Sequence, residues 1–390
     1  MKICFYCNTI FSYGGVQRVL AVIAKALSKN HNVTILTLDD PSLEDKTMYG
    51  LDSADLHYAY LKYPKLPTYE MLPCKTFSLL YKKLLPQNKL FSRWYGYSSF
   101  PQTHRSILIN QIKTGDYDVI VGVHVFLSFH LASIHKSIRA NTIGWMHNSY
   151  DAYFTMENSY LGNLKNLFVH QMPLLDRIIV LSNYDKRLYL KELNIKSEVI
   201  YNPLTIIPGE VSSLFNKKFL AIGRFSHLHK GFDILIKAFA IFAQTNYDWT
   251  LDIVGEGPEE PLLRSIIHQH QLENRVTLHP FTNDVQKYYS AASIYVLSSR
   301  WEGFGLVLFE AMSSGLPIIS SDIPVAKELL EGEGVAVFFK SEDMNDLAQK
   351  MREMINNNKL KQMSDAALQY ASINGIEKII LQWETLLKDI

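Results

Sequence analysis

The sequence is poor in cysteine, in net charge and in long hydrophobic runs, and each shortage excludes something. Three cysteines in 390 residues, an odd and sparse count, fit a reducing cytosol. Thirty-nine basic residues nearly balance thirty-eight acidic ones, so the formal charge of +1 argues against general binding of DNA or RNA. The longest uncharged stretch, residues 119–135, carries three histidines and is too short to span a membrane.

The N-terminal segment predicts neither a redox site nor a targeting signal. Cys4 and Cys7 form a CxxC pair inside an apolar run, whereas a redox pair belongs at a helix N-terminus, where the thiolate is stabilised. The first eight residues turn polar too early for the core of a signal peptide. We therefore expect a cytoplasmic protein, and association with the inner face of the membrane is left open.

The apolar content is high enough for more than one folded core. At roughly 150 residues per domain, 390 residues with 47% apolar side chains suggest two or three units. The charge is unevenly divided: residues 1–200 hold 22 basic and 15 acidic residues, and the remainder holds 17 and 23. This asymmetry suggests that the two halves meet different partners.

Strand and helix patterns recur at two places in the chain. Residues 2–7 predict a buried strand, which leads through Gly14-Gly15 into a helix and then into a second strand at 33–38. The same order begins again at residue 218 and ends at residue 254. Further strands are expected at 117–125, 142–146, 177–181, 198–201, 276–278, 294–297, 317–320 and 335–339. The fold class is therefore α/β, with two Rossmann-like, doubly wound parallel-sheet domains.

Proline and glycine place the domain junction. Pro203, Pro208 and Gly209 end the first domain, so we expect domains at 1–203 and 204–375. A last helix is predicted within 376–390; it can pack back on the N-terminal domain, although the pattern does not choose between the two.

Residues 49–105 break the strand and helix rhythm. They hold twelve aromatic residues, with eight basic residues against three acidic ones. A basic aromatic insertion of this kind can lie against an anionic membrane or a lipid pyrophosphate. The alternative is that its aromatics pack on the core and its cations are simply solvated.

The second domain carries the motifs with the clearest chemistry. Arg224 and Lys230 lie in the loop after its first strand, where an open α/β sheet binds its ligand, and such cations can clamp a diphosphate. Farther on, Glu302 precedes Gly303-Phe304-Gly305, and Glu310 follows inside the helix that this loop opens. The helix terminus favours phosphate, and the carboxylates suit sugar or ribose hydroxyls.

With these motifs the sequence resembles the retaining glycosyltransferases of family four, which have the GT-B fold of two domains facing across a cleft. The resemblance covers nearly the whole chain except residues 41–115. The segments that carry it are residues 14–19, 223–224, 230–231, 255–258, 302–312 and 315–317.

The resemblance implies roles for individual residues. Arg224 and Lys230 match the cations that bind the donor diphosphate, Glu310 the carboxylate that takes the ribose, and Glu302 the one near the transferred sugar. His147 matches a histidine of the cleft, so Glu302, His147, Arg224 and Lys230 form the predicted catalytic set. The remaining predicted contacts are Gly15, Phe281, Phe304, Gly305 and Leu306 for the donor, and Gly14, Gly15 and Gln17 for the acceptor.

It also implies the reaction. A hexosyl or N-acetylhexosaminyl group would move, with retention, from a nucleotide sugar carrying UDP or GDP to a hydroxyl of a glycan or lipid-linked acceptor in surface polysaccharide synthesis. No cofactor or metal is expected, and Asp116-Tyr117-Asp118, which spells the DxD of metal-dependent enzymes, is interpreted as the entry to a strand. A sugar-nucleotide epimerase and a non-catalytic nucleotide-sugar-binding protein are the alternatives.

Overall fold

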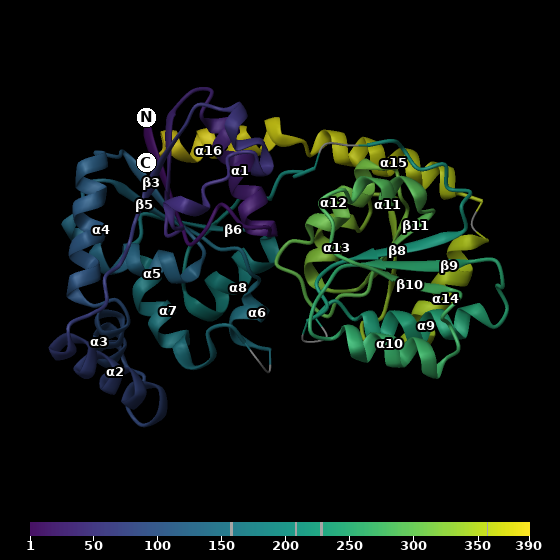
Figure 1. Cartoon of the computed structure of the whole chain (residues 1–390), viewed down its shortest axis with the longest axis horizontal. Coiled ribbons are helices and arrows are strands. Elements are labelled where there is room, and N and C mark those ends of the chain that lie inside the picture. The colour runs from purple at the N-terminus through teal and green to yellow at the C-terminus, as the bar shows by residue number, and fades with distance from the viewer. Residues whose placement is uncertain (157–158, 207–208, 227–228, 357) are drawn as a thin grey trace. The chain divides into compact units, whose positions relative to one another are not determined.

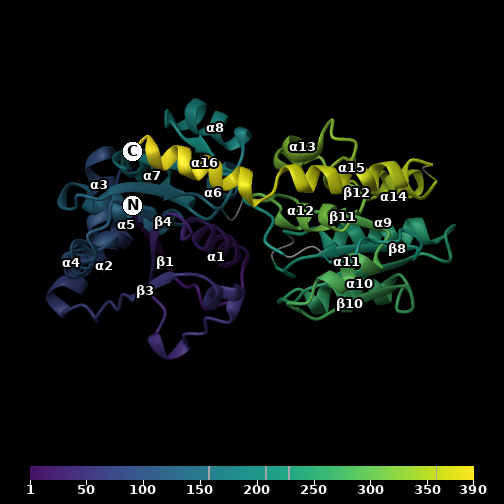
Figure 2. The ribbon, with the colours of Figure 1, turned by 90° about the horizontal axis from the view of Figure 1, so that it is seen from above.

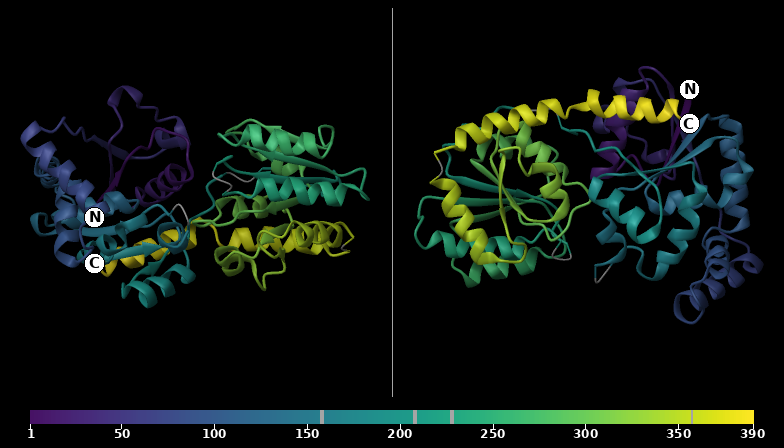
Figure 3. Two further views of the ribbon diagram at one scale, coloured as in Figure 1. Left: turned by 90° about the horizontal axis from the view of Figure 1, so that it is seen from below. Right: turned by 180° about the vertical axis from the view of Figure 1, so that it is seen from behind.

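The computed structural model describes residues 1–156, 159–206, 209–226, 229–356 and 358–390. The chain divides into two units, shown in Figure 1 and, from other sides, in Figures 2 and 3. Unit 1 consists of Met1–Pro203 together with Ile376–Ile390, and unit 2 of Leu204–Gly375. Pro208, one of the residues expected to mark the junction, lies outside the described residues.

A parallel sheet forms the centre of unit 1. The order of its strands is β3-β2-β1-β4-β5-β6-β7, and β1 pairs with β2 on one side and β4 on the other, so that Cys4 faces both Thr34 and Ile120. The strands are β1 (Lys2–Cys7), β2 (Asn32–Thr37), β3 (Leu56–Tyr60), β4 (Val119–Val123), β5 (Asn141–Trp145), β6 (Arg177–Val180) and β7 (Glu198–Val199). Because the order reverses at β1, the loops after β1 and β4 meet at the carboxyl edge, where doubly wound sheets bind ligands.

The helices of unit 1 include one from the far end of the chain. They are α1 (Gly15–Leu27), α2 (Thr68–Lys83), α3 (Lys89–Ser99), α4 (Gln102–Gly115), α5 (Val125–Ile134), α6 (Tyr150–Phe154), α7 (Lys165–Gln171), α8 (Asn183–Leu193) and α16 (Ile376–Lys388). Trp383 of α16 is fully buried, with ring centroids 6.0 Å from Phe5 and 5.0 Å from Trp145. A helix that inserts an indole among the strands' aromatic side chains is part of this core.

Unit 2 repeats the architecture around a second parallel sheet of order β10-β9-β8-β11-β12-β13. Its strands are β8 (Lys218–Ile222), β9 (Thr250–Val254), β10 (Val276–His279), β11 (Ile294–Leu297), β12 (Ile318–Ser321) and β13 (Ala336–Phe339). Its helices are α9 (Phe232–Ala243), α10 (Glu260–Gln269), α11 (Gln286–Ala291), α12 (Leu306–Ser313), α13 (Pro324–Leu330), α14 (Met344–Ile355) and α15 (Leu360–Ile373). The predicted α/β class with two doubly wound sheets is confirmed.

Two expectations need correction. The strand expected at 117–125 ends at Val123, because His124 has a positive φ of 95° and α5 begins at Val125. The segment 49–105 is not wholly an insertion, since β3 pairs in parallel with β2 and extends the sheet to Tyr60. As an edge strand with only partly buried side chains, β3 has no apolar run by which the sequence could reveal it.

Candidate active site

Close backbone packing brings together the loops after β8, β9 and β11 in unit 2. A Cβ atom at Gly255 would lie 1.9 Å from the carbonyl oxygen of Gly223, and one at Gly231 would lie 2.0 Å from that of Ser298. Gly231 also has a φ of +62°, a conformation that favours glycine. These glycines therefore let three loops meet at the carboxyl edge of the sheet.

Where these loops meet, the side chains of Lys230 and Glu302 form an ion pair. The Lys230 Nζ donates to Glu302 Oε1 at 2.7 Å, and the Ser299 hydroxyl donates to the same oxygen at 2.6 Å. Both side chains are largely shielded, 14% and 7% exposed. Glu302 is therefore not a solvent-facing carboxylate, and two residues that lie 72 positions apart in the sequence form one buried ion pair.

The surroundings of the Glu302 carboxyl lower its pKa. Burial alone would raise this pKa, but the Lys230 ammonium, the His229 ring and the hydrogen bonds from Lys230 and Ser299 outweigh it and hold the pKa below its usual value. Glu302 is thus a carboxylate throughout the neutral pH range. Such a fixed charge suits the positioning of a cation and of sugar hydroxyls, not the donation of a proton.

His229 belongs to the same cluster, although it is not among the predicted site residues. Its ring stacks on Trp301 with centroids 3.6 Å apart, its Nε2 donates to the Trp301 carbonyl oxygen at 2.6 Å, and Nε2 lies 4.0 Å from Glu302 Oε2. Burial lowers the pKa of His229 to about 4. The adjacency of His229 to Lys230 was the available signal, but only the Trp301 stack shows that the ring faces the loop of Glu302.

Glu310 lies in α12, in a second buried polar group. It is 2% exposed and accepts hydrogen bonds from the Tyr289 hydroxyl at 2.9 Å and the Thr205 hydroxyl at 3.4 Å. Neither partner was predicted as a site residue. The carboxylate is therefore not solvent-facing, and it already accepts hydroxyl donors of the kind that a ribose would offer.

The amino-terminus of α12 is open for an anion. Gly305 precedes the helix with a φ of +82°, and no side chain caps the first turn, which begins at Leu306. The Phe304 side chain is buried and stacks on Phe309, with centroids 5.5 Å apart, so only its backbone can face a ligand. Unsatisfied N–H groups at a helix start are a favourable place for phosphate oxygens.

Two predicted donor residues stand apart from these buried groups. Arg224 is exposed, and among the residues that the structure describes no carboxylate pairs with its guanidinium. Phe281, in the loop after β10, is 45% exposed. The structure thus groups Lys230 with Glu302, places Arg224 on the same β8 loop as an exposed cation, and leaves the Phe281 side chain partly exposed.

In unit 1 the glycine loop after β1 is covered by a tyrosine that sequence reasoning missed. The Gly14 N–H donates to the Tyr49 hydroxyl at 2.9 Å, and that hydroxyl donates to the Ser12 carbonyl oxygen at 2.9 Å. Gln17 donates from Nε2 to the Ser12 hydroxyl at 3.2 Å, and Gly15 begins α1. Tyr49 itself has a positive φ of 55°, so its placement on the loop carries some backbone strain.

His147 is buried at the carboxyl end of β5. Its Nε2 has no hydrogen-bond partner within the described structure, and its ring lies 4.4 Å from that of Trp145. Burial and the nearby His124 ring lower the pKa of His147 to about 3. Burial likewise lowers the pKa of His124 to about 4. Both imidazoles are therefore neutral near pH 7, and His147 has an unused hydrogen-bonding atom, which a satisfied structural histidine would not have.

Other motifs from the sequence have structural roles. Cys4 and Cys7 are fully buried in β1, and burial raises the pKa of Cys7 to about 12, the opposite of what a redox thiol requires. Asp118 accepts a hydrogen bond from the Lys2 backbone N–H at 2.7 Å at the entry to β4, and Asp116 lies 3.4 Å from the Lys2 ammonium. In the described part of the chain, no group of three or more His, Cys, Asp or Glu side chains is arranged to hold a metal ion. The helices of that part also lack the combination of length and hydrophobicity that a membrane-spanning segment requires.

Comparison with known families gives two matches that together span both units. The family described as "Glycosyltransferase Family 4" matches residues 13–206, and the one described as "Glycosyl transferases group 1" matches residues 210–370.

Individual relatives agree with these families. An uncharacterized glycosyltransferase of Haemophilus influenzae is 31% identical over 99% of both chains. An N-acetylgalactosaminyltransferase of Campylobacter jejuni, whose name specifies a diphospho-undecaprenol substrate, is 23% identical over 89% of this chain and 88% of its own.

Solved structures share the fold. The sucrose-phosphate synthase of Thermosynechococcus elongatus aligns with a TM-score of 0.77 at 16% identity, over 100% of this chain and 99% of its own. Anabaena HepE in complex with UDP-glucose aligns with a TM-score of 0.73 at 20% identity over the full length of both chains.

Proposed function

This chain belongs to glycosyltransferase family 4 and has the GT-B fold, and on that premise we propose the details of the sugar transfer that it catalyses. The donor is a nucleoside diphosphate sugar, carrying UDP or GDP, that is held by unit 2. A hexosyl or N-acetylhexosaminyl group moves with retention to a hydroxyl of the acceptor, without a metal ion. The observation that carries this proposal is the buried ion pair between Lys230, on the loop after β8, and Glu302, on the loop that leads to the uncapped start of α12.

The leaving diphosphate is stabilised by two cations with different tasks. Arg224 is exposed and has no carboxylate partner within the described structure, so its guanidinium is available for bidentate hydrogen bonds to phosphate. Lys230 is already fixed by Glu302 and presents a positioned positive charge. With the N–H groups at the start of α12, these charges supply the electrostatic stabilisation that a metal ion provides in other enzymes.

Glu302 and Glu310 bind hydroxyls in this proposal. Glu302 lies beside the sugar that is transferred, and Glu310 takes the ribose of the donor. As the bond from the anomeric carbon to the diphosphate oxygen breaks, the acceptor oxygen bonds to the same face of that carbon. The departing phosphate oxygen accepts the hydroxyl proton, so no protein base is needed. His147, neutral with a free Nε2, serves as a hydrogen-bond partner rather than as an acid.

The acceptor is a glycan or a lipid-linked sugar used in the synthesis of surface polysaccharide. The support comes from the relatives, one of which is named for a diphospho-undecaprenol substrate and another for amylovoran biosynthesis. A lipid-linked acceptor lies at a membrane surface, so peripheral contact with the inner face of an anionic membrane is part of the proposal. Epimerase activity is not favoured, because the matching families and relatives are glycosyltransferases.

A donor panel tests this proposal. Purified protein is mixed with UDP-, GDP-, ADP- and TDP-sugars, with and without a chelator, while thermal stabilisation and nucleotide release are measured. We expect one donor to stabilise the protein in the presence of chelator. Loss of that effect on chelation would contradict the metal-independent assignment, and silence with every donor would contradict the role of Arg224 and Lys230.

A further inference from the structure

The hairpin formed by α2 and α3, residues 68–99, projects from the rest of unit 1 (Figures 1 and 3). Its inner side is firmly packed: Tyr81 is 1% exposed, donates or accepts a hydrogen bond with Ser92 at 2.8 Å, and stacks on Tyr95 with centroids 4.6 Å apart. Of the two helices, α3 packs on α7 and α2 packs mainly on α3. Helix α2 is thus the outer element of the hairpin, and the side of α2 that faces away from α3 has no helix of the hairpin packed on it.

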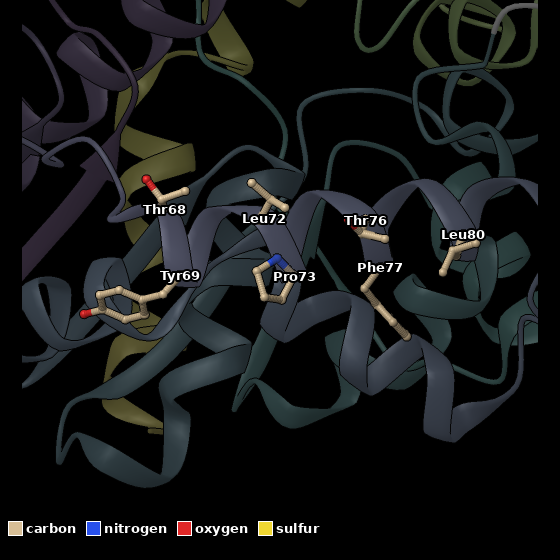
Figure 4. A pocket seen from close by; sticks show the side chains of 7 residues that line it. All are labelled: Thr68, Tyr69, Leu72, Pro73, Thr76, Phe77 and Leu80. Atoms are coloured by element: carbon tan, nitrogen blue, oxygen red, sulfur yellow. The ribbon is translucent and has the colours of Figure 1, made fainter.

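That far side is apolar and open. Figure 4 shows seven side chains following one another along α2, and they line a groove of about 880 Å³. Because an α-helix repeats every 3.6 residues, Leu72, Thr76 and Leu79 share one side, opposite the buried Tyr81. Leu72 is 58% exposed and Leu79 is 59% exposed, while Tyr69 at the start of the helix is 82% exposed. None of these residues belongs to the predicted site, so the groove is a separate surface.

The charges around this surface have one sign. Residues 56–115 contain nine basic residues and a single acidic one, Glu70, whose carboxylate accepts hydrogen bonds from Thr103. The exposed cations of the hairpin are Lys75, Lys82, Lys83, Lys89 and Arg93. Within the described residues none of them is paired with a carboxylate, so their charge is available to an outside partner.

We propose that the outer face of the α2–α3 hairpin docks this enzyme on an anionic phospholipid membrane. Exposed leucines and aromatics of this extent mark an interaction site, since soluble monomers rarely leave such a patch uncovered. Leucine and tryptophan side chains insert at the acyl boundary while flanking lysines meet anionic headgroups. This inference rests on the proposed lipid-linked acceptor, and it names the surface that brings the enzyme to it.

The structure also settles which aromatic residues of the segment can take part. Tyr81, Tyr95 and Phe100 are buried and serve the core, whereas Tyr69 and Trp94 are exposed, at 82% and 49%. The two interpretations left open by the sequence therefore apply to different side chains. The membrane-facing set lies on the hairpin, and the core set anchors the hairpin to unit 1.

Vesicle binding by the full chain tests the proposal. Sedimentation is measured with vesicles of phosphatidylcholine alone and with about one third phosphatidylglycerol, at low salt and at about 0.5 M salt. The charge variant is Lys75→Glu, Lys82→Glu and Lys83→Glu. Its matched control reverses three exposed lysines elsewhere in unit 1, Lys29→Glu, Lys136→Glu and Lys196→Glu. An apolar variant, Leu72→Ser with Leu79→Ser, is matched by Leu190→Ser with Leu381→Ser, all four being exposed.

We expect binding to the anionic vesicles only, weakened about tenfold or more by the hairpin charge variant and much less by its control. The apolar variant should lose the binding that persists at high salt. Equal loss of vesicle binding in both charge variants would show a general charge effect and would overturn the proposal. The proposal would also be overturned if the parent protein did not bind vesicles, or if it self-associated and the apolar variant abolished that self-association. Donor stabilisation, measured on the same samples without vesicles, separates the two hypotheses: its failure with intact vesicle binding contradicts the proposed function alone.

Discussion

In unit 2 the carboxyl edge of the sheet holds a buried ion pair, Lys230 with Glu302, whereas the same edge of unit 1 holds two neutral histidines, His124 and His147. The loops differ in the same way. The β8 loop of unit 2 carries two cations, and the β1 loop of unit 1 satisfies its Gly14 amide with the neutral hydroxyl of Tyr49. The β8 loop of unit 2 therefore presents positive charge, whereas the β1 loop of unit 1 is held by the Tyr49 hydroxyl and by the Asp39 carboxylate, which accepts from the Ile10 N–H at 2.8 Å.

This difference matches the two substrates of the proposed reaction. A nucleoside diphosphate brings negative charge that must be balanced before and during bond cleavage, and fixed cations do this without reorganising. An acceptor hydroxyl is neutral, so neutral hydrogen-bond partners suffice. Changes in unit 2 should therefore affect turnover and donor binding most, and changes in unit 1 should have smaller effects.

The largest effect is expected for Glu302→Ala. It leaves the Lys230 ammonium unpaired in a largely shielded site, which costs about 3 kcal/mol of stability, and it removes a positioned charge, which should lower turnover about 100- to 1,000-fold. Nucleotide binding should be largely kept. The measurements are sugar transfer, nucleotide affinity and denaturant unfolding, with Glu302→Gln as the control of unchanged shape. Unchanged turnover would remove Glu302 from the reaction.

The second comparison is between the two cations on the β8 loop of unit 2, Arg224 and Lys230. Arg224→Ala should weaken donor binding about tenfold while the free energy of unfolding changes by less than about 0.5 kcal/mol, since the side chain is exposed. Lys230→Ala should weaken donor binding and also destabilise the unit by about 3 kcal/mol, because Glu302 is left buried without its partner. Arg264→Ala, an exposed arginine paired with Glu260, is the control for both. Equal stability of the two variants would show that the ion pair is not structural.

The third prediction concerns pH and unit 1. Burial lowers the pKa of His147 to about 3, so between pH 6.5 and pH 3 the unfolded chain binds a proton that the folded chain does not. The free energy of unfolding should therefore rise with pH across this window. When the pH falls from 6.5 to 5, His147 should account for about 2 kcal/mol of the decrease in that free energy. Denaturant unfolding of His147→Gln at both pH values should show a smaller difference than the parent. An unaltered pH dependence in the variant would mean that the pKa of His147 is not lowered by burial in the folded protein.

The smallest effect is expected for Tyr49→Phe. The variant removes one hydroxyl that accepts from the Gly14 amide and donates to the Ser12 carbonyl, a change worth about 1 kcal/mol of stability. Because Tyr49 belongs to unit 1, donor affinity should stay constant while the KM for acceptor changes a few-fold. Tyr13→Phe, an exposed tyrosine in the same loop, serves as the control. A loss of donor affinity instead would assign the glycine loop to the donor.

Much of the candidate site could be predicted because its signals are local. Arg224, Lys230 and Glu302 lie next to glycines in loops, where loop conformation limits which residues fit, and Glu310 follows inside the helix that the loop of Glu302 opens. Their roles in donor binding stay predictions. His229, Tyr289 and Tyr49 could not be selected in this way, because each joins the site through a partner between 21 and 72 positions away in the sequence.

The sequence by itself determined the two doubly wound sheets, because parallel strands buried on both faces must be runs of apolar residues, and these can be read directly. Only the tertiary structure decided that α16 packs on unit 1, that Glu302 is buried against Lys230, and that the α2–α3 hairpin divides its aromatics between core and surface. The physical reason is that burial depends on which distant segment covers a side chain, and an amphipathic helix shows that it needs a partner without showing which one.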